Sequence, residues 1–241
     1  MKAVYKNIYD AISNGKKLLA VLMDPDKFPI ENTSRFIKKI NTSIATHIFV
    51  GGSTVAENET DSLVAEISKH TTLPIVLFPG DVVQITDKAD AILFLSLISG
   101  RNPEYLIGKH IKAVSKLKNT DLEVIPTGYI LLENGKKTAV ENVTNTNPIP
   151  RTNIQTIEDT AKAGELLGMK LIYLEAGSGA SEPITDDIIQ RIKKELQIPL
   201  IVGGGIRTKK QLENAYNAGA DLVVIGTAFE EDESFFDKLK R

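Results

Sequence analysis

Three glycine-containing segments in the last third of the chain carry the residue types best suited to hold a phosphate. Gly177-Ser-Gly179, Gly203-Gly-Gly205 and Gly226-Thr227 each follow a short apolar run. Glycine lets a ligand approach bare backbone N–H groups, and such groups beside a helix N-terminus commonly bind phosphate. The last two segments are one helix and one strand apart, so both turns should flank one point. We therefore predict a phosphate site there. The alternative is that these glycines only form tight turns.

Two side chains just before the first segment could extend this site. Glu175 ends an otherwise apolar run and could accept hydrogen bonds from the hydroxyl groups of a polyol phosphate. Tyr173 could add a phenolic donor. The alternatives are a solvated turn residue for Glu175 and a core-filling aromatic ring for Tyr173.

A second candidate site follows apolar runs near the N-terminus. Asp24 and Asp26 come after the first run, and Ser53-Thr54 come after the second. A carboxylate and a hydroxyl without a nearby histidine suit Mg²⁺, which proteins bind through one or two carboxylates plus substrate phosphates. Asp26 is either a second ligand or a helix cap.

Eight apolar runs alternate with segments of helical periodicity, and this order predicts a parallel α/β barrel. The expected strands span residues 18–23, 46–50, 74–78, 91–96 and 122–126, with three more that begin at 171, 199 and 221. The expected helices span residues 4–14, 31–40, 57–69, 102–118, 155–168, 186–196, 209–218 and 229–239. We predict one (β/α)8 barrel domain over residues 1–241. Both candidate sites should then share its mouth, at the C-terminal ends of the strands.

Two connections depart from the regular pattern. Only residues 80–90 separate the third and fourth strands, and a parallel crossover with its helix needs at least about 10–12 residues. We expect a turn or an abbreviated helix there, which leaves one flank of the barrel with a thin helical layer. Residues 133–151 are polar and contain Asn134-Gly135, so they predict a long loop that acts as a lid or a binding loop. Apolar residues near the middle of the barrel mouth could line a groove between the two sites: Phe78, Ile98, Tyr129, Ile130 and Leu131.

Composition narrows the function classes. The net charge of −2 implies no broad basic surface for nucleic acid, so we expect no nucleic-acid partner. The absence of cysteine fits a cytoplasmic protein. The sequence shows neither a signal peptide nor about 18 consecutive apolar residues, although a transient contact with a membrane surface to collect a lipid stays open. The histidines are scattered and are interpreted as structural: His47, His70 and His110.

Taken together in order and spacing, these motifs resemble the geranylgeranylglyceryl phosphate synthases. The motifs are Asp24-Pro-Asp-Lys27, Gly51-Gly-Ser53, Gly128-Tyr129, Tyr173-Leu-Glu-Ala-Gly-Ser-Gly179, Gly203-Gly-Gly205 and Gly226-Thr227. This family joins a polyprenyl diphosphate to sn-glycerol 1-phosphate through an ether bond and releases pyrophosphate. The short connection between strands 3 and 4 agrees with the resemblance. Leu22 stands where bacterial heptaprenyl-transferring relatives carry a lysine, so the sequence is closer to the archaeal-type branch.

The resemblance also implies roles for individual residues. Asp24 and Ser53 would hold Mg²⁺, with Asp24 taking part in catalysis, and Glu175 would bind the glycerol hydroxyls and either orient the attacking one or accept its proton. It also implies a homo-oligomer and a geranylgeranyl diphosphate as the prenyl substrate. The implied substrate-binding residues are Tyr129, Tyr173, Leu174, Glu175, Ala176, Gly177, Ser178, Gly179, Gly204, Gly205, Gly226 and Thr227.

Two other functions are compatible with a phosphate-binding barrel. A sugar-phosphate isomerase would need an acid or a base at the end of strand 5, where the sequence reads Ile125-Pro-Thr-Gly128. A non-catalytic protein that binds a phosphorylated ligand would not need the pair of Asp24 and Ser53.

Overall fold

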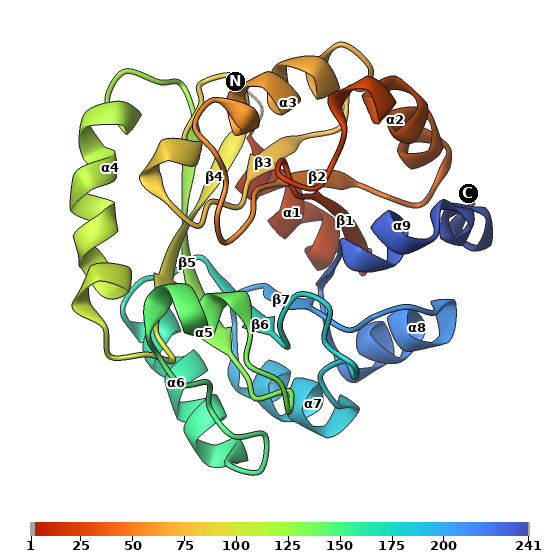
Figure 1. The fold of residues 1–241 in the computed structure, drawn as a ribbon. Coiled ribbons are helices and arrows are strands. Elements are labelled where there is room, and N and C mark those ends of the chain that lie inside the picture. The colour runs from red at the N-terminus through yellow and green to blue at the C-terminus, as the bar shows by residue number, and fades with distance from the viewer. Residues whose placement is uncertain (1–2, 241) are drawn as a thin grey trace.

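The computed structural model describes residues 3–240 as a closed barrel of parallel strands surrounded by helices (Figure 1). Each strand pairs with the next one along the chain, and the last strand closes on the first, with Leu222 opposite Leu18. The predicted (β/α)8 architecture is therefore confirmed. The strands are Leu18–Met23 (β1), His47–Val50 (β2), Ile75–Leu77 (β3), Ala91–Leu97 (β4), Glu123–Leu131 (β5), Leu171–Glu175 (β6), Leu200–Gly203 (β7) and Leu222–Ile225 (β8).

Helices cover most of the outside of the barrel and several begin with a local capping signal. Thr208 and Gln211 form a reciprocal capping box at the start of one helix, which satisfies N–H groups that have no partner within the helix. The helices are Val4–Ser13 (α1), Thr33–Thr42 (α2), Glu59–Ser68 (α3), Lys109–Leu117 (α4), Ala139–Thr144 (α5), Ile154–Leu166 (α6), Asp186–Glu195 (α7), Lys209–Ala218 (α8) and Thr227–Glu231 (α9). Shorter turns are Ile30–Asn32 (η1), Val82–Gln84 (η2), Glu104–Gly108 (η3) and Glu233–Leu239 (η4).

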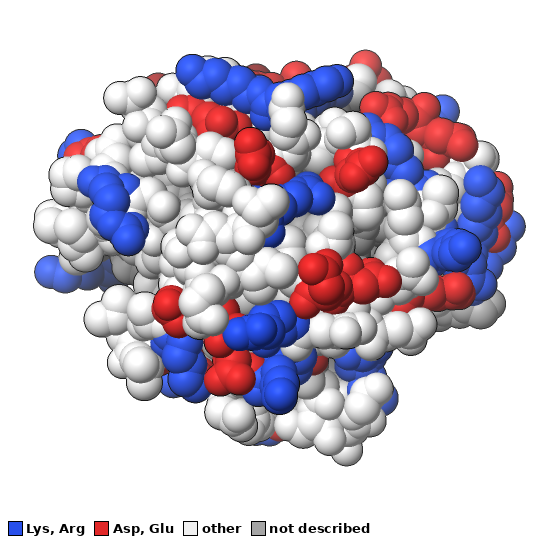
Figure 2. All heavy atoms as spheres, turned by 90° about the horizontal axis from the view of Figure 1, so that it is seen from below, with Lys and Arg blue, Asp and Glu red and all other residues white. Residues whose placement is uncertain are grey.

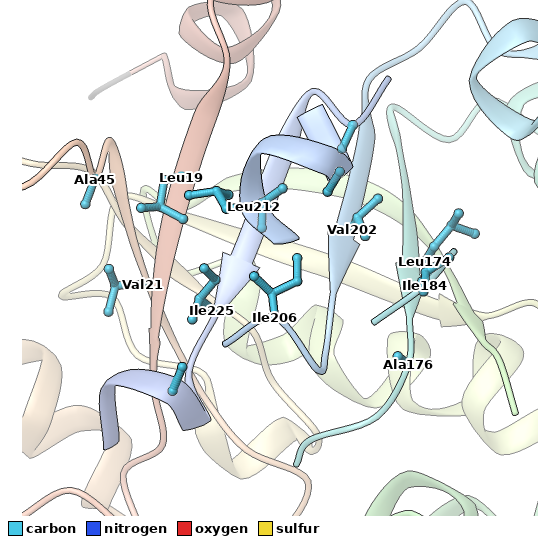
Figure 3. Packing of buried hydrophobic residues seen from close by; sticks show 14 of the residues in the cluster. Leu19, Val21, Ala45, Leu174, Ala176, Ile184, Val202, Ile206, Leu212 and Ile225 are labelled. Atoms are coloured by element: carbon cyan, nitrogen blue, oxygen red, sulfur yellow. The ribbon is translucent and has the colours of Figure 1, made fainter. Parts of the chain in front are cut away.

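Alternation along each strand divides the apolar residues between two clusters. Leu18 and Ala20 belong to the cluster inside the barrel, whereas Leu19 and Val21 belong to the cluster between the strands and the helices. This follows from the two-residue period of a strand, which sends successive side chains to opposite faces. Figure 3 shows part of the outer cluster. The same alternation decides which residues of β6 can reach the inside of the barrel.

Helix α1 covers the N-terminal end of the barrel. Val4 and Ile8 are buried in the inner cluster, and the N–H groups of Val4 and Tyr5 donate to the carboxylate of Glu123 at the start of β5. This carboxylate caps the first turn of α1 and favours it through the helix dipole. Apolar packing and this cap therefore fill the end of the barrel opposite the predicted sites.

The connection between β3 and β4 contains only the single turn η2, as the residue count predicts. Here the barrel lacks the helix that a regular repeat would supply. On this flank α4 contacts the connection directly, because Lys116 Nζ donates to the carbonyl oxygen of Val82 at 3.1 Å.

Three local boundaries differ from those expected. β5 continues through Pro126 to Leu131, because pairing with β6 begins only at Thr127 and the proline lies where β5 is paired with β4 alone. The loop at residues 133–151 contains α5, whose first turn is capped by Thr138. The last expected helix is two pieces, α9 and η4, because the backbone is extended at Asp232.

Candidate functional site

One cavity of about 480 Å³ opens at the C-terminal ends of the strands. It brings together most of the residues that the sequence singled out, from both the early and the late part of the chain. Those that line it are Asp24, Asp26, Ser53, Thr54, Phe78, Tyr129, Tyr173, Glu175, Ser178, Gly179, Gly204, Gly205, Gly226 and Thr227.

The turns that follow β6 and β7 are packed against each other. A Cβ atom on Gly203 would lie 2.2 Å from the hydroxyl oxygen of Tyr173, and one on Gly204 would lie 2.6 Å from Glu175 Oε1. Gly204 and Gly205 also adopt φ values of 85° and 74°, which side chains rarely tolerate. Glycine is thus required by both space and backbone conformation, and the backbone of these turns faces the cavity.

Three residues of the β6 motif do not line the cavity. Leu174 and Ala176 are fully buried in the outer cluster, and Figure 3 shows Leu174 on β6 and Ala176 just after it. Gly177 faces the 133–151 segment, because a Cβ atom on it would lie 2.5 Å from Asn134 Nδ2. The side chains of Leu174 and Ala176 therefore point away from any ligand in the cavity.

Glu175 is the buried carboxylate of the site. Its side chain points into the barrel, the residue is only 6% exposed, and the Gly177 N–H donates to Oε1 at 2.6 Å. Burial raises the pKa of Glu175 to about 7, and the Gly177 N–H and the Tyr173 hydroxyl offset part of the rise. A carboxylate with this pKa can take a proton from a hydroxyl near neutral pH.

Three aromatic rings stand beside Glu175 in the cavity wall. The rings of Phe78 and Tyr173 are stacked, with centroids 5.2 Å apart and planes 9° apart. Tyr129 lies 5.3 Å from Tyr173 and 6.0 Å from Phe78. Burial raises the pKa of both tyrosines well above the ordinary value, so both are neutral at physiological pH.

Asp24 lies in the opposite wall of the cavity. Its Oδ2 pairs with Lys27 Nζ at 2.8 Å, and its Oδ1 accepts from the Asp26 N–H at 3.2 Å. A Cβ atom on Gly52 would lie 2.7 Å from Asp24 Oδ1, which places the segment that carries Ser53 directly beside Asp24. Asp26 links this segment to the connection between β2 and α3, because its Oδ1 accepts from the Ala56 N–H at 3.1 Å.

Glu230 on α9 also lines this wall, although sequence reasoning did not select it. Burial raises the pKa of Glu230; the positive charge of Lys27 lowers it in part and the negative charge of Asp24 raises it. Its position depends on how α9 folds back over the mouth, which no local motif indicates.

This wall offers a hard cation few protein ligands. Among residues 3–240, no group of three or more histidine or acidic side chains could hold a metal ion. Asp24 with Ser53 nearby is nevertheless a suitable donor set for Mg²⁺, since that ion commonly takes one or two carboxylates and fills its other positions with water and substrate phosphates.

An apolar groove extends the cavity toward the flank that lacks a helix. It runs between β4, η2, α4 and α5, and the expected groove residues Phe78 and Tyr129 lie in its wall. Ile98, Ile130 and Leu131 do not line it. Ile130 is buried in the outer cluster and Ile98 packs against that cluster, whereas Leu131 is buried in the inner cluster. The other apolar walls come from Val82, Ile85, Ile92, Phe94, Leu95, Leu97, Tyr105, Ala113, Val140 and Val143.

The fold and the cavity thus define a β/α-barrel protein in which glycine turns, a buried carboxylate and an apolar groove meet in one mouth. Residues 12–241 match the model of the PcrB family. The chain belongs to the PcrB family.

Curated relatives and solved structures agree with this assignment. Proteins named geranylgeranylglyceryl phosphate synthase from Flavobacterium johnsoniae and Zunongwangia profunda are 55% and 57% identical, over 98% and 97% of this chain and 98% and 99% of their own. The one from Pyrococcus abyssi is 42% identical over 97% of this chain and 92% of its own.

The crystal structure of (S)-3-O-geranylgeranylglyceryl phosphate synthase from Thermoplasma acidophilum, in complex with substrate sn-glycerol-1-phosphate, superposes with a TM-score of 0.93 at 33% identity. The match covers 99% of this chain and 96% of that one. The resemblance seen in the motifs, including to archaeal proteins, is therefore confirmed.

Proposed function

We propose that this protein is a prenyltransferase that joins sn-glycerol 1-phosphate to a polyprenyl diphosphate, geranylgeranyl in the expected case, and releases pyrophosphate. The observation that carries the proposal is one cavity that joins glycine turns, the buried Glu175 and an apolar groove. The names of the relatives and the glycerol phosphate complex of the Thermoplasma acidophilum enzyme support it.

The glycine turns bind the phosphate of sn-glycerol 1-phosphate in this proposal. Backbone N–H groups at three strand ends suit a small dianion, since they donate without a side chain that must be ordered. Glu175 binds the glycerol hydroxyls, and Tyr173 and Tyr129 form the wall beside them. The cavity-lining members of this set are Ser178, Gly179, Gly204, Gly205, Gly226 and Thr227. Gly177, Leu174 and Ala176 contribute by shaping the β6 turn.

Asp24 and Ser53 hold Mg²⁺ in this proposal, next to the diphosphate of the prenyl substrate. When bound, the ion neutralises charge that develops on the departing pyrophosphate. The apolar groove takes the prenyl tail and excludes water from the reacting carbon.

The reaction forms one bond and breaks another at the same carbon. The terminal hydroxyl oxygen of glycerol phosphate bonds to C1 of the prenyl chain, and the bond between C1 and the diphosphate oxygen breaks with its electron pair. The hydroxyl proton passes to a carboxylate oxygen of Glu175. Positioning of the two substrates supplies much of the rate, because both are held by groups fixed to strand ends.

Product formation tests this function directly. The purified protein is incubated with sn-glycerol 1-phosphate, Mg²⁺ and a series of prenyl diphosphates, and the ether product is measured by mass spectrometry. We expect product with at least one chain length, and none from the same mixture with a metal chelator. Absence of ether product with every chain length would contradict the proposal. A sugar-phosphate isomerase is not favoured, since Tyr129 and Leu131 occupy the end of β5.

We also propose that the protein works in the cytoplasm as a homo-oligomer and contacts membranes only transiently. None of the helices within residues 3–240 is long and apolar enough to cross a bilayer.

Exposed apolar surface supports the homo-oligomer. Large apolar side chains are exposed on η3, α4 and the end of α6, and the side of the molecule shown in Figure 2 has a broad area without charge. Light scattering after size-exclusion chromatography measures the oligomer, and a monomer at micromolar concentration would contradict this part. The exposed side chains are Ile107, Ile111, Val114, Leu166 and Leu167.

A further inference from the structure

The cavity is acidic for a site that receives a diphosphate. Five carboxylates line it against three permanent cations, so an anionic headgroup needs a cation close to it. Leu22, the residue of β1 that lines the cavity, is apolar and supplies no such cation. The carboxylates are Asp24, Asp26, Asp81, Glu175 and Glu230, and the cations are Lys27, Lys109 and Arg207.

Two of these cations are less suited to a headgroup at the entrance of the apolar groove, because one pairs with the carboxylate expected to hold Mg²⁺ and the other lies among the glycine turns. Lys27 pairs with Asp24 at 2.8 Å, and more than half of its side chain is exposed. Arg207 belongs to the glycine side of the mouth, where Nη1 donates to the Ala180 carbonyl oxygen at 2.7 Å. Lys109 is the remaining one.

Lys109 projects from the start of α4 into the wall that carries Asp24. Its ammonium group pairs with Asp81 and lies 3.3 Å from the carbonyl oxygen of Gly80. Gly80 is packed on the segment that carries Ser53, because a Cβ atom on it would lie 2.7 Å from the Ser53 carbonyl oxygen. The ammonium group is therefore one loop away from the residues expected to hold Mg²⁺.

The surroundings of Lys109 also mark the boundary between headgroup and tail. Its Nζ lies 4.6 Å from the centroid of the Tyr105 ring, and the next residues on the same face of α4, His110 and Ala113, line the apolar groove. Only 20% of the Lys109 side chain is exposed. A diphosphate whose tail entered the groove would pass beside this ammonium group.

We propose that Lys109 binds the diphosphate of the prenyl substrate, and that Asp81 holds its ammonium group in place until the substrate arrives. This inference rests on the proposed function, because it assigns a residue to that same site. A phosphate oxygen replaces the Asp81 carboxylate as the acceptor, in a charge-assisted hydrogen bond of the same kind. Asp81 keeps a partner after the exchange, since its Oδ1 also accepts from the Val83 N–H at 3.3 Å.

A purely structural reading makes a different prediction from the same contacts. If the pair of Lys109 and Asp81 only fastened α4 to the short β3–β4 connection, loss of either partner would have the same effect. If Lys109 binds the ligand, loss of Asp81 removes a competitor for its ammonium group. Lys109→Met and Asp81→Asn should then act in opposite directions.

Calorimetry with inorganic pyrophosphate and Mg²⁺ distinguishes the two readings without any turnover. We expect Lys109→Met to weaken pyrophosphate binding by about 10- to 100-fold, as for a lost hydrogen bond to a charged group, and Lys109→Arg to restore most of it. Asp81→Asn should bind pyrophosphate as tightly as the wild type or more tightly, since Asn keeps the acceptor for the Val83 N–H. The matched control is Lys112→Met, one turn of α4 away and paired with Glu104.

Glycerol phosphate affinity and thermal unfolding are measured on the same variants. Both should match the wild type, which separates lost binding from lost folding. Equal weakening by Lys109→Met and Asp81→Asn, or no weakening by Lys109→Met, would overturn the proposal, as would a wild type that binds no pyrophosphate. Failure of the prenyl transfer itself would instead show as missing ether product with pyrophosphate binding intact.

Discussion

The two sides of the barrel mouth are built from different groups of atoms, backbone on one side and side chains on the other. On the β6–β8 side the wall is backbone, held by glycines that leave no room for side chains at Gly203 and Gly204. On the β1–β4 side it is side chains, with Asp24, Lys109 and apolar residues next to a connection that lacks its helix. A backbone cradle is rigid and suits one small anion of fixed shape. Side chains on a thin flank suit a charged headgroup with a long tail.

Glu175 stands where the two sides meet, so its removal should have the largest effect. Glu175→Gln keeps the shape but cannot take a proton, and we expect the turnover number to fall by about 10²- to 10⁴-fold, the usual contribution of a general base. Steady-state kinetics with both substrates measure it. The control is Glu182→Gln, an exposed glutamate of the following loop. Turnover within a few-fold of wild type would mean that Glu175 only positions the glycerol.

Asp24→Ala tests whether the two sides bind different substrates. Loss of the only acidic ligand proposed for Mg²⁺ should lower turnover by at least about 100-fold, while the affinity for glycerol phosphate changes little. The two quantities are measured by product formation and by calorimetry. If glycerol phosphate affinity fell instead, Asp24 would belong to the opposite side of the mouth.

Gly204→Ala tests the backbone cradle. The added methyl would lie 2.6 Å from Glu175 Oε1 at a φ of 85°, so we expect glycerol phosphate affinity to drop by about tenfold or more, with prenyl diphosphate affinity unchanged. Gly168→Ala is the matched control, because Gly168 has a φ of 90° and nothing near its Cβ position. Equal effects of both variants on glycerol phosphate affinity would assign the loss to backbone strain alone.

The pH dependence should be the most gradual of these effects, because each pH unit changes the rate by tenfold at most. With the pKa of Glu175 at about 7, the carboxylate is mostly protonated at pH 6 and mostly ionised at pH 8. If it accepts the proton, kcat/KM should rise by about tenfold per unit below pH 7 and level off above it. Rate measurements between pH 5.5 and 8.5 test this, and the rise should be absent in Glu175→Gln. A wild-type profile that is flat or falls over this range would contradict the assignment of the base.

The two sides also differ in how well the sequence predicted them. The glycine side is local: each turn follows its own strand, so the order of motifs was enough to predict that Ser178, Gly204 and Thr227 share a cavity. The two-residue period could also have placed Leu174 on the outer face, since it alternates with Tyr173 and Glu175.

The groove side depends on contacts between distant segments. Lys109 and Glu230 reach the cavity from helices, and their direction is set by how each helix is rotated against the barrel. The missing helix was predictable, because it follows from a count of residues between two strands. The groove walls on α4 and α5 were not, because helical periodicity marks only the face that packs on the barrel.

The flank without a helix has a consequence for the motion of the barrel. β3 and β4 share two register pairs, Val76 with Ala91 and Leu77 with Ile92, whereas β4 and β5 share seven. The backbone amides of β3 should therefore exchange with deuterium sooner than those of the other strands, through local opening that does not unfold the whole domain. A prenyl chain bound along the β3–β4 pair would slow this exchange. Deuterium exchange of the β3 amides would therefore report whether a prenyl chain occupies the groove.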